Sequence, residues 1–309
     1  MGKTAFLFSG QGAQRAGMGK EFYEHFTSVR ALFDAAEELR PGTLQQMFAG
    51  SDDELRQTEN TQPCLYLADL AAAYALRDSG LQPEAVAGFS LGEIPALAFA
   101  GAYDALTGFR LACARGASMA RAGKNVNASM AAIVKLPDET VERLCAAYDH
   151  VWPVNYNCDG QIAVSGDRDE LERLYADVAA AGGRSMPLNV SGGFHSPYMD
   201  PASAEFGAIL ADTVLRKPAL PAYANCTAEP YGENVRELLT QQINHPVRWK
   251  ETLRHLNEQG FDTFVECGAG MVLCKLVRKN LPECRSFAVD SLAGLAKLQE
   301  EGLLCCSAT

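Results

Sequence analysis

The segment Gly88-Phe89-Ser90-Leu91-Gly92 constrains the fold of this chain more than any other part of its sequence. It joins a short apolar run, residues 85–89, to a helix-like run, residues 91–99. A serine between two glycines in this setting is typical of a nucleophile elbow, a turn so tight that larger side chains would crowd it. The serine hydroxyl then lies at a helix N-terminus, where free N–H groups favour developing negative charge. The segment predicts a strand–turn–helix unit and indicates acyl transfer through a serine ester.

The composition excludes several classes of protein. The 309 residues are 48% hydrophobic and 21% charged, an ordinary globular balance with enough chain for a sizeable core. The net charge of −11 argues against nucleic acid or an anionic membrane surface as the main partner. We recognise no signal peptide, and the longest apolar run, residues 65–76, contains Asp69 and is too short to span a bilayer. The ten cysteines lack metal-ligand spacing. We therefore expect a cytoplasmic protein with reduced thiols and no metal site.

Strands that alternate with helices predict a parallel sheet covered on both faces. Buried strands are expected at residues 4–9 and 85–89, and helices at 19–39, 52–57, 61–80, 91–99 and 105–121. A strand at 221–225, a helix ending in 249–256 and a strand at 263–267 are expected to complete this sheet.

The pattern changes from about residue 126. Strand-like segments at 129–136, 151–157, 161–165 and 184–190 are interleaved with helix-like segments at 137–148 and 167–181. This β-α-β-β-α-β order is that of a ferredoxin-like unit. We therefore predict an α/β fold: a large α/β-hydrolase-like domain with a central, mainly parallel sheet (residues 1–125 and 195–309) and an inserted ferredoxin-like small domain (residues 126–194).

A serine nucleophile needs a base, and the chain has five histidines. His195 is the strongest candidate because glycines precede it, Pro197 follows it, and it lies at the predicted junction of the two domains. Four aspartates between Ser90 and His195 are considered as a third member, and all four lie in the inserted domain, where none ends a strand of the large domain: Asp138, Asp149, Asp159 and Asp167. We therefore expect a dyad in which a neutral acceptor orients the histidine, in place of a Ser–His–Asp triad.

Arg115 stands alone in a nearly apolar stretch, residues 111–119. A buried guanidinium needs an anion, which could be a protein carboxylate or a substrate carboxylate.

Two groups of basic residues are candidates for a local positive surface, although solvated faces are the simpler explanation: Lys275, Arg278 and Lys279, and Arg248, Lys250 and Arg254.

Taken together, these motifs closely resemble malonyl-CoA:acyl-carrier-protein transacylases of type II fatty acid synthesis, and they are also similar to the acyltransferase domains of polyketide synthases. The resemblance covers roughly residues 4–290. It rests on residues 10–14, 61–63, 88–93, Arg115 with Met119, 155–157 with 160–161, 193–196, and Gln242 followed by 246–249.

The resemblance implies a role for each matching residue. Ser90 would carry the malonyl ester, His195 would act as base and acid, and the backbone carbonyl of Gln242 would orient the imidazole. Backbone N–H groups of Gln11 and Leu91 would form the oxyanion hole, and Arg115 would bind the malonyl carboxylate. The remaining substrate-binding positions would be Gln62, Met119, Asn157, Gln161 and Phe194. The implied partners are malonyl-CoA and acyl carrier protein, with no cofactor, and we expect a monomer.

Two positions depart from the family pattern. Phe89 stands where the family usually has histidine, which could alter the mouth of the pocket and the acyl selectivity. Residues 268–271 read Gly-Ala-Gly-Met in place of the usual Gly-Pro-Gly-Lys. Three alternatives stay open: a discrete acyltransferase of a polyketide synthase, a hydrolase that releases acyl groups to water, and a non-catalytic acyl-binding protein.

Overall fold

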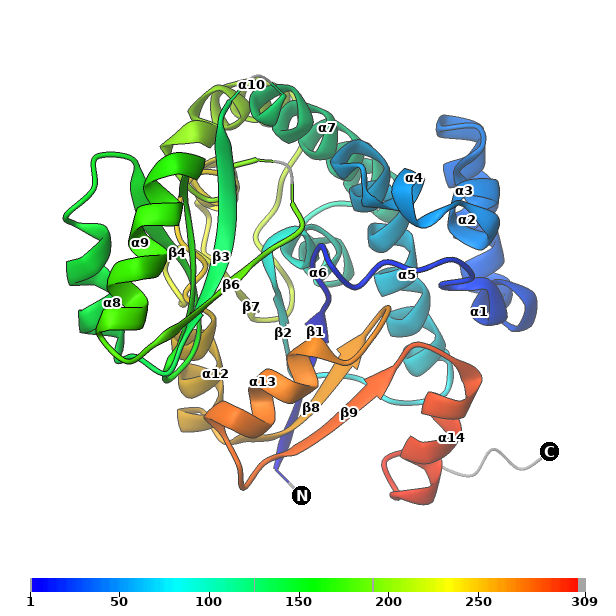
Figure 1. The fold of residues 1–309 in the computed structure, drawn as a ribbon. Helices are drawn as coiled ribbons and strands as arrows, with labels where there is room; N and C mark the ends of the chain where they lie inside the picture. The colour runs from blue at the N-terminus through cyan, green and yellow to red at the C-terminus, as the bar shows by residue number, and fades with distance from the viewer. Residues whose placement is uncertain (1, 125, 191, 305–309) are drawn as a thin grey trace.

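The chain folds around two separate β-sheets, as the computed structural model of residues 2–124, 126–190 and 192–304 shows (Figure 1). The larger sheet has five parallel strands in the order β7-β2-β1-β8-β9. Its strands are β1 (Lys3–Phe8), β2 (Ala85–Gly88), β7 (Ala222–Tyr223), β8 (Phe261–Cys267) and β9 (Arg285–Val289). The first strand lies at the centre, which buries it on both sides.

Both faces of the parallel sheet are covered, because alternate side chains of β1 enter different hydrophobic cores. Phe6 and Phe8 pack in the core formed with α5 (Thr58–Asp78), α6 (Glu93–Phe99) and α7 (Ala105–Gly123). Ala5 and Leu7 pack in the core formed with α12 (Trp249–Glu258) and α13 (Val272–Asn280). The other helices are α1 (Lys20–His25), α2 (Thr27–Leu39), α3 (Thr43–Ala49), α4 (Asp52–Arg56), α10 (Asp200–Ala211), α11 (Val235–Gln241) and α14 (Leu292–Glu300).

The smaller sheet is antiparallel, with the strand order β4-β5-β3-β6. It consists of β3 (Ala128–Val134), β4 (Val151–Cys158), β5 (Gln161–Asp167) and β6 (Arg184–Pro187). Helices α8 (Asp138–Cys145) and α9 (Arg168–Ala180) pack on one face and share a core with it, on the outer side of the molecule in Figure 1. The Asp167 side chain caps α9 by accepting from the N–H groups of Asp169 and Glu170. Sequence order and strand order together are those of a ferredoxin-like unit, as expected.

The α/β architecture predicted from the sequence is confirmed, with differences in detail. The parallel sheet does not end at residues 263–267, because β9 adds a fifth strand at its edge. Helices α3, α10, α11, α13 and α14 also lie outside the predicted elements. The exact boundaries proposed for the inserted domain, residues 126 and 194, stay a prediction. No helix in the described ranges is long and apolar enough to cross a membrane.

Candidate active site

The nucleophile elbow forms where β2 ends and the chain turns into α6. Ser90 begins a short 3₁₀ turn, Ser90–Gly92, with a φ of 54°, a left-handed conformation that serine rarely adopts. A Cβ atom on Gly88 would lie 1.9 Å from the carbonyl carbon of Gly92, and one on Gly92 would lie 2.1 Å from the carbonyl oxygen of Phe8. Glycine is therefore required at both positions, for the crowding expected from the sequence.

Ser90 and His195 lie in contact, although 105 residues separate them. The Ser90 Oγ atom is 2.7 Å from the His195 Nε2 atom. On the other side of the ring, the Nδ1 atom is 2.9 Å from the Gln242 carbonyl oxygen and 3.2 Å from that of His245. Because both oxygens can only accept, the Nδ1 atom carries the proton and the Nε2 atom is free to accept one from Ser90. The acceptor is neutral, as the lack of a suitable aspartate had suggested.

The surroundings keep the imidazole of His195 uncharged. Burial, and to a smaller extent the positive charge of Arg115, lower the pKa of His195 to about 4. The hydrogen bonds to the two carbonyl groups oppose this change only in part. His195 is therefore ready to accept a proton throughout the neutral pH range.

Arg115 lies on α7, fully buried, and directs its guanidinium at the nucleophile. Its Nη2 atom is 3.3 Å from the Ser90 Oγ atom and 2.8 Å from the Gln242 Oε1 atom, while its Nη1 atom donates to the Gln62 Oε1 atom at 2.9 Å. All these partners are neutral, and no ion pair of Arg115 with a carboxylate is found in the described part of the chain. Burial lowers the pKa of Arg115 to about 10, so the group stays charged at neutral pH. Among the described residues no protein carboxylate contacts Arg115, and the buried Glu93 carboxylate acts on its charge only without direct contact.

Gln242 joins the three functional groups, which the sequence did not reveal. Its carbonyl oxygen binds His195, its Oε1 atom accepts from Arg115, and its Nε2 atom donates to the Ser90 carbonyl oxygen at 2.5 Å. The residue directly follows α11 and is 1% exposed. Only its backbone carbonyl was expected to take part; the side chain also fixes the guanidinium relative to the elbow.

Two adjoining cavities lead to Ser90. The inner one, about 100 Å³, and the outer one, about 240 Å³, share Gln11, Phe89, Asn155 and Leu188 as lining residues. The inner cavity brings together Ser90, His195 and five of the other predicted site residues, Gln11, Gln62, Leu91, Met119 and Phe194. Of the remaining four, Asn157 and Gln161 line the outer cavity, and Arg115 and Gln242 line neither cavity. Phe89 lies at the junction of the cavities, and its ring packs edge-on against Trp249, with the two ring centroids 5.3 Å apart.

Some backbone N–H groups around the elbow already donate a hydrogen bond within the protein, and others do not. The Phe89 N–H donates to the Phe8 carbonyl, the Gly92 N–H to the Phe89 carbonyl, and the Ser90 N–H to the Asn225 side chain. Over the described residues, no hydrogen bond is found for the N–H groups of Gln11 and Leu91. Both residues line the inner cavity, and their N–H groups are therefore available to an oxygen placed beside Ser90.

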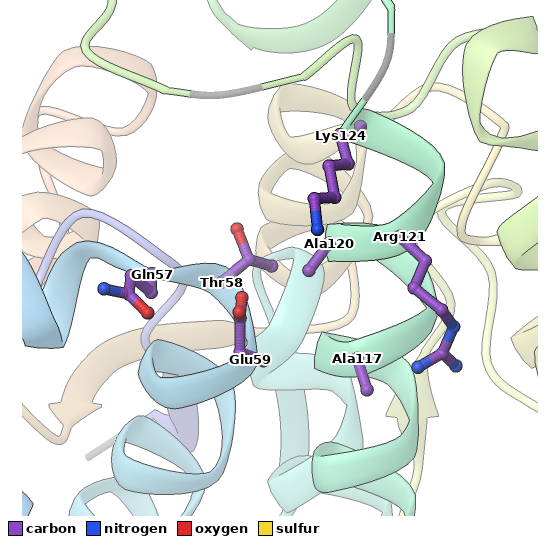
Figure 2. Close-up of a pocket in the computed structure, with 8 residues that line it drawn as sticks. Gln57, Thr58, Glu59, Ala117, Ala120, Arg121 and Lys124 are labelled. Atoms are coloured by element: carbon purple, nitrogen blue, oxygen red, sulfur yellow. The ribbon is translucent and has the colours of Figure 1, made fainter.

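A larger surface depression, about 550 Å³, lies between the start of α5 and the end of α7 (Figure 2). Figure 2 shows the Lys124 side chain directed toward Thr58, while the Arg121 guanidinium points away from it and pairs with Glu205. The depression contains neither Ser90 nor His195, so size alone does not locate the chemistry.

The two basic clusters differ in their partners. In the second cluster Arg248, Lys250 and Arg254 each pair with an acidic side chain, which cancels much of the positive charge. On α13, Lys275, Arg278 and Lys279 are exposed, and none of them forms an ion pair within the ranges that the structure describes. Lys279 donates to Gln161 at the outer cavity, and Leu273 and Leu276 of the same helix line that cavity.

Comparison with known proteins agrees with this site. A family model described as the acyl transferase domain matches residues 5–305. The malonyl CoA-acyl carrier protein transacylase of Bacillus subtilis (strain 168) is 36% identical over 299 residues, 94% of each chain. The crystal structure of the malonyl CoA-acyl carrier protein transacylase from Clostridium perfringens superposes with a TM-score of 0.94 at 33% identity, covering 97% of this chain and 96% of that one. A malonyl-transacylase solved in complex with its type II polyketide synthase acyl-carrier protein, PlMCAT:AntF, gives a TM-score of 0.92 at 32% identity, covering 97% and 99%. The chain therefore belongs to the acyl transferase family of malonyl CoA-acyl carrier protein transacylases.

Proposed function

We propose that this chain transfers a malonyl group from malonyl-CoA to the phosphopantetheine thiol of acyl carrier protein, through an ester on Ser90. One observation carries the proposal. A charged, fully buried Arg115 lies 3.3 Å from the Ser90 Oγ atom, and every hydrogen-bond partner it has is neutral. A malonyl group on Ser90 supplies an anion in direct contact with the guanidinium, whereas an acetyl group does not.

The reaction has two half-reactions with a shared intermediate. In the first, the Ser90 Oγ atom attacks the thioester carbonyl of malonyl-CoA while the His195 Nε2 atom takes the hydroxyl proton. The negative charge on the carbonyl oxygen is met by the N–H groups of Gln11 and Leu91; one such donor typically stabilises a transition state by about 3 kcal/mol. The carbon–sulfur bond then breaks, and His195 returns the proton to the CoA thiolate.

The second half-reaction repeats these steps with the carrier thiol as the attacking group. His195 takes the thiol proton, the thiolate attacks the malonyl ester, and the proton returns to the Ser90 oxygen. The carbonyl acceptors on the Nδ1 atom keep the imidazole in one tautomer and orientation through both half-reactions. The chemistry needs no cofactor and no metal.

The surface of α13 is the part of the molecule that best suits an acidic carrier protein. Lys275 and Arg278 are exposed there, beside the helix face that lines the outer cavity. The phosphopantetheine arm would pass through the outer cavity, along Asn157 and Gln161, to reach Ser90. We place the chain in the cytoplasm as a monomer that supplies extender units for fatty acid synthesis.

A second pathway deserves a direct comparison, because the relatives include a transacylase paired with a polyketide carrier. The chemistry on Ser90 would be the same, and the carrier alone would differ. Measuring kcat/KM with a fatty acid carrier and with a polyketide carrier under the same conditions separates the two.

Intact-protein mass after brief mixing with malonyl-CoA tests the proposal. We expect one malonyl adduct that is absent in Ser90→Ala and moves to the carrier when phosphopantetheinylated carrier protein is added. An adduct that is released as free malonate before carrier is added would favour the hydrolase. A chain that never forms the adduct under these conditions would contradict malonyl transfer.

A further inference from the structure

The pairing of β2 with its neighbour β7 stops just before the nucleophile. The two strands are in register at Val86 with Ala222 and at Ala87 with Tyr223, where β7 ends. Beyond this point β1 still pairs with Gly88 on one side, but the Gly88 carbonyl and the Ser90 N–H have no paired β7 residue on the other side. Such groups need hydrogen-bond partners, because leaving them unpaired inside a protein is costly.

One side chain supplies both partners. The Asn225 Oδ1 atom accepts from the Ser90 N–H at 2.7 Å, and its Nδ2 atom donates to the Gly88 carbonyl at 2.6 Å. The orientation of the amide follows from these partners, since an N–H can only donate and a carbonyl can only accept. Asn225 is 1% exposed, so water does not compete for these bonds.

We propose that Asn225 is a positioning residue of the reaction: its side-chain amide takes the place of the peptide unit that β7 no longer provides, and it thereby holds Ser90 in its reactive conformation. The φ of 54° at Ser90 is a strained value that persists only where the surroundings impose it. By engaging the Ser90 N–H, Asn225 also leaves the Leu91 N–H as the one elbow donor, among residues 89–92, without a partner.

Asn225 is itself held by two neighbouring segments. Its backbone N–H donates to the Glu93 Oε1 atom at 3.1 Å, and the Tyr231 hydroxyl donates to the same oxygen. Its carbonyl oxygen accepts from the Arg248 N–H at 2.9 Å. Glu93 and Tyr231 are 1% and 5% exposed, so this support is buried. Asn225 therefore connects the elbow with the segment that follows Gln242, and a change at Glu93 or Tyr231 would reach Ser90 through it.

The first test measures the rate and the amplitude of acylation separately. Asn225→Ala is mixed with malonyl-CoA in a quenched-flow instrument, and the adduct is followed by intact-protein mass. We expect an acylation rate constant roughly 100-fold lower, the scale for a nucleophile displaced by about 1 Å, with the burst amplitude unchanged. Asn60→Ala is the matched control, because Asn60 also donates one hydrogen bond and accepts another between segments, outside the elbow. A normal rate with a reduced amplitude would mean that Asn225 only supports folding, and a normal rate and amplitude would also overturn the proposal.

A second variant gives a pH dependence that a purely structural role would not produce. In Asn225→Asp, the ionised carboxylate can accept from the Ser90 N–H but cannot donate to the Gly88 carbonyl. Protonation restores the donor, and burial raises the pKa of such a carboxyl group into the measurable range. Burial raises the pKa of the neighbouring Glu93 to about 7, so Glu93 titrates in the same range in both proteins. The acylation rate constant of the variant relative to that of the unmodified protein should therefore rise roughly tenfold as the pH falls from about 8 to about 5.5, the rate equivalent of one hydrogen bond. A profile parallel to that of the unmodified protein would contradict the proposal.

The inference uses the proposed acyl donor, so one probe must be independent of it. A fluorophosphonate reacts with an activated serine without any acyl-CoA. If the unmodified protein reacts with the fluorophosphonate but not with malonyl-CoA, the proposed function fails and Asn225 can still be judged with the probe. If Asn225→Ala reacts with both reagents as fast as the unmodified protein, the positioning role fails and the proposed function stands.

Discussion

Replacement of Arg115 by alanine is the sharpest test of acyl selection. The guanidinium is fully buried, and it lies 3.3 Å from the oxygen that would carry the acyl group. Each hydrogen bond between charged groups contributes about 1.5–3 kcal/mol, and removing one partner of a buried charge pair costs about 3–5 kcal/mol. A loss of about 3 kcal/mol in the transition state for malonyl transfer corresponds to a rate roughly 150-fold lower. Acetyl transfer does not use this pair.

The structure also predicts a smaller, general effect of the same substitution. Arg115 donates to the Oε1 atoms of Gln62 and Gln242, and Gln242 in turn holds the Ser90 carbonyl. Its removal should slow acetyl transfer as well, because the elbow loses support. The informative quantity is therefore the ratio of the two acylation rate constants, not either rate alone.

The assay is single-turnover acylation with malonyl-CoA and, separately, with acetyl-CoA. Arg110→Ala is the matched control, since Arg110 is an exposed arginine on the same helix. We expect the malonyl-to-acetyl ratio to fall about 100-fold in Arg115→Ala and to stay unchanged in Arg110→Ala. Equal loss of both activities in Arg115→Ala would refute the reasoning and leave Arg115 as a structural residue.

Three further predictions follow from the site. Because a base works only when unprotonated and burial lowers the pKa of His195 to about 4, acylation should stay constant as the pH falls from neutrality and decline only near pH 4; a decline near the ordinary histidine pKa would contradict this. Charge reversal at Lys275 and Arg278 should raise the KM for carrier protein about tenfold and leave malonyl-CoA acylation intact, as steady-state and single-turnover kinetics would show; unchanged carrier kinetics would remove α13 as the docking surface. Gly92→Ala should abolish acylation or lower the midpoint of thermal unfolding, because the new Cβ atom would lie 2.1 Å from a backbone oxygen. Gly232→Ala, where the nearest atom is 3.5 Å away, should have neither effect, and equal behaviour of the two variants would disprove the packing argument.

The elements that were predicted from the sequence are those with a strong local pattern. Residues 4–9 and 85–89 are short apolar runs and form the buried strands β1 and β2. The β-α-β-β-α-β order of the inserted unit was also predicted, because the helix at 167–181 has one apolar stripe and turn residues separate the strands at 151–157 and 161–165. In contrast, β9 is an edge strand with only two buried residues, Phe287 and Val289, so its apolar pattern is weak. Helix α11 is only seven residues long, too short for a clear stripe.

The sequence by itself determined the elbow, since the two glycines and the serine lie within five positions and their crowding is local. His195 and Arg115 were candidates from their own sequence surroundings, and the resemblance to the transacylases gave them roles and added the Gln242 carbonyl. Only the tertiary structure revealed that the Gln242 side chain binds Arg115 and that Asn225 holds the elbow. The first contact joins residues that are 127 positions apart in the sequence, and the second joins residues that are 135 positions apart. Periodicity and spacing describe neighbours within a few turns or along one strand, and they carry no signal for pairs that meet only when separate elements pack together.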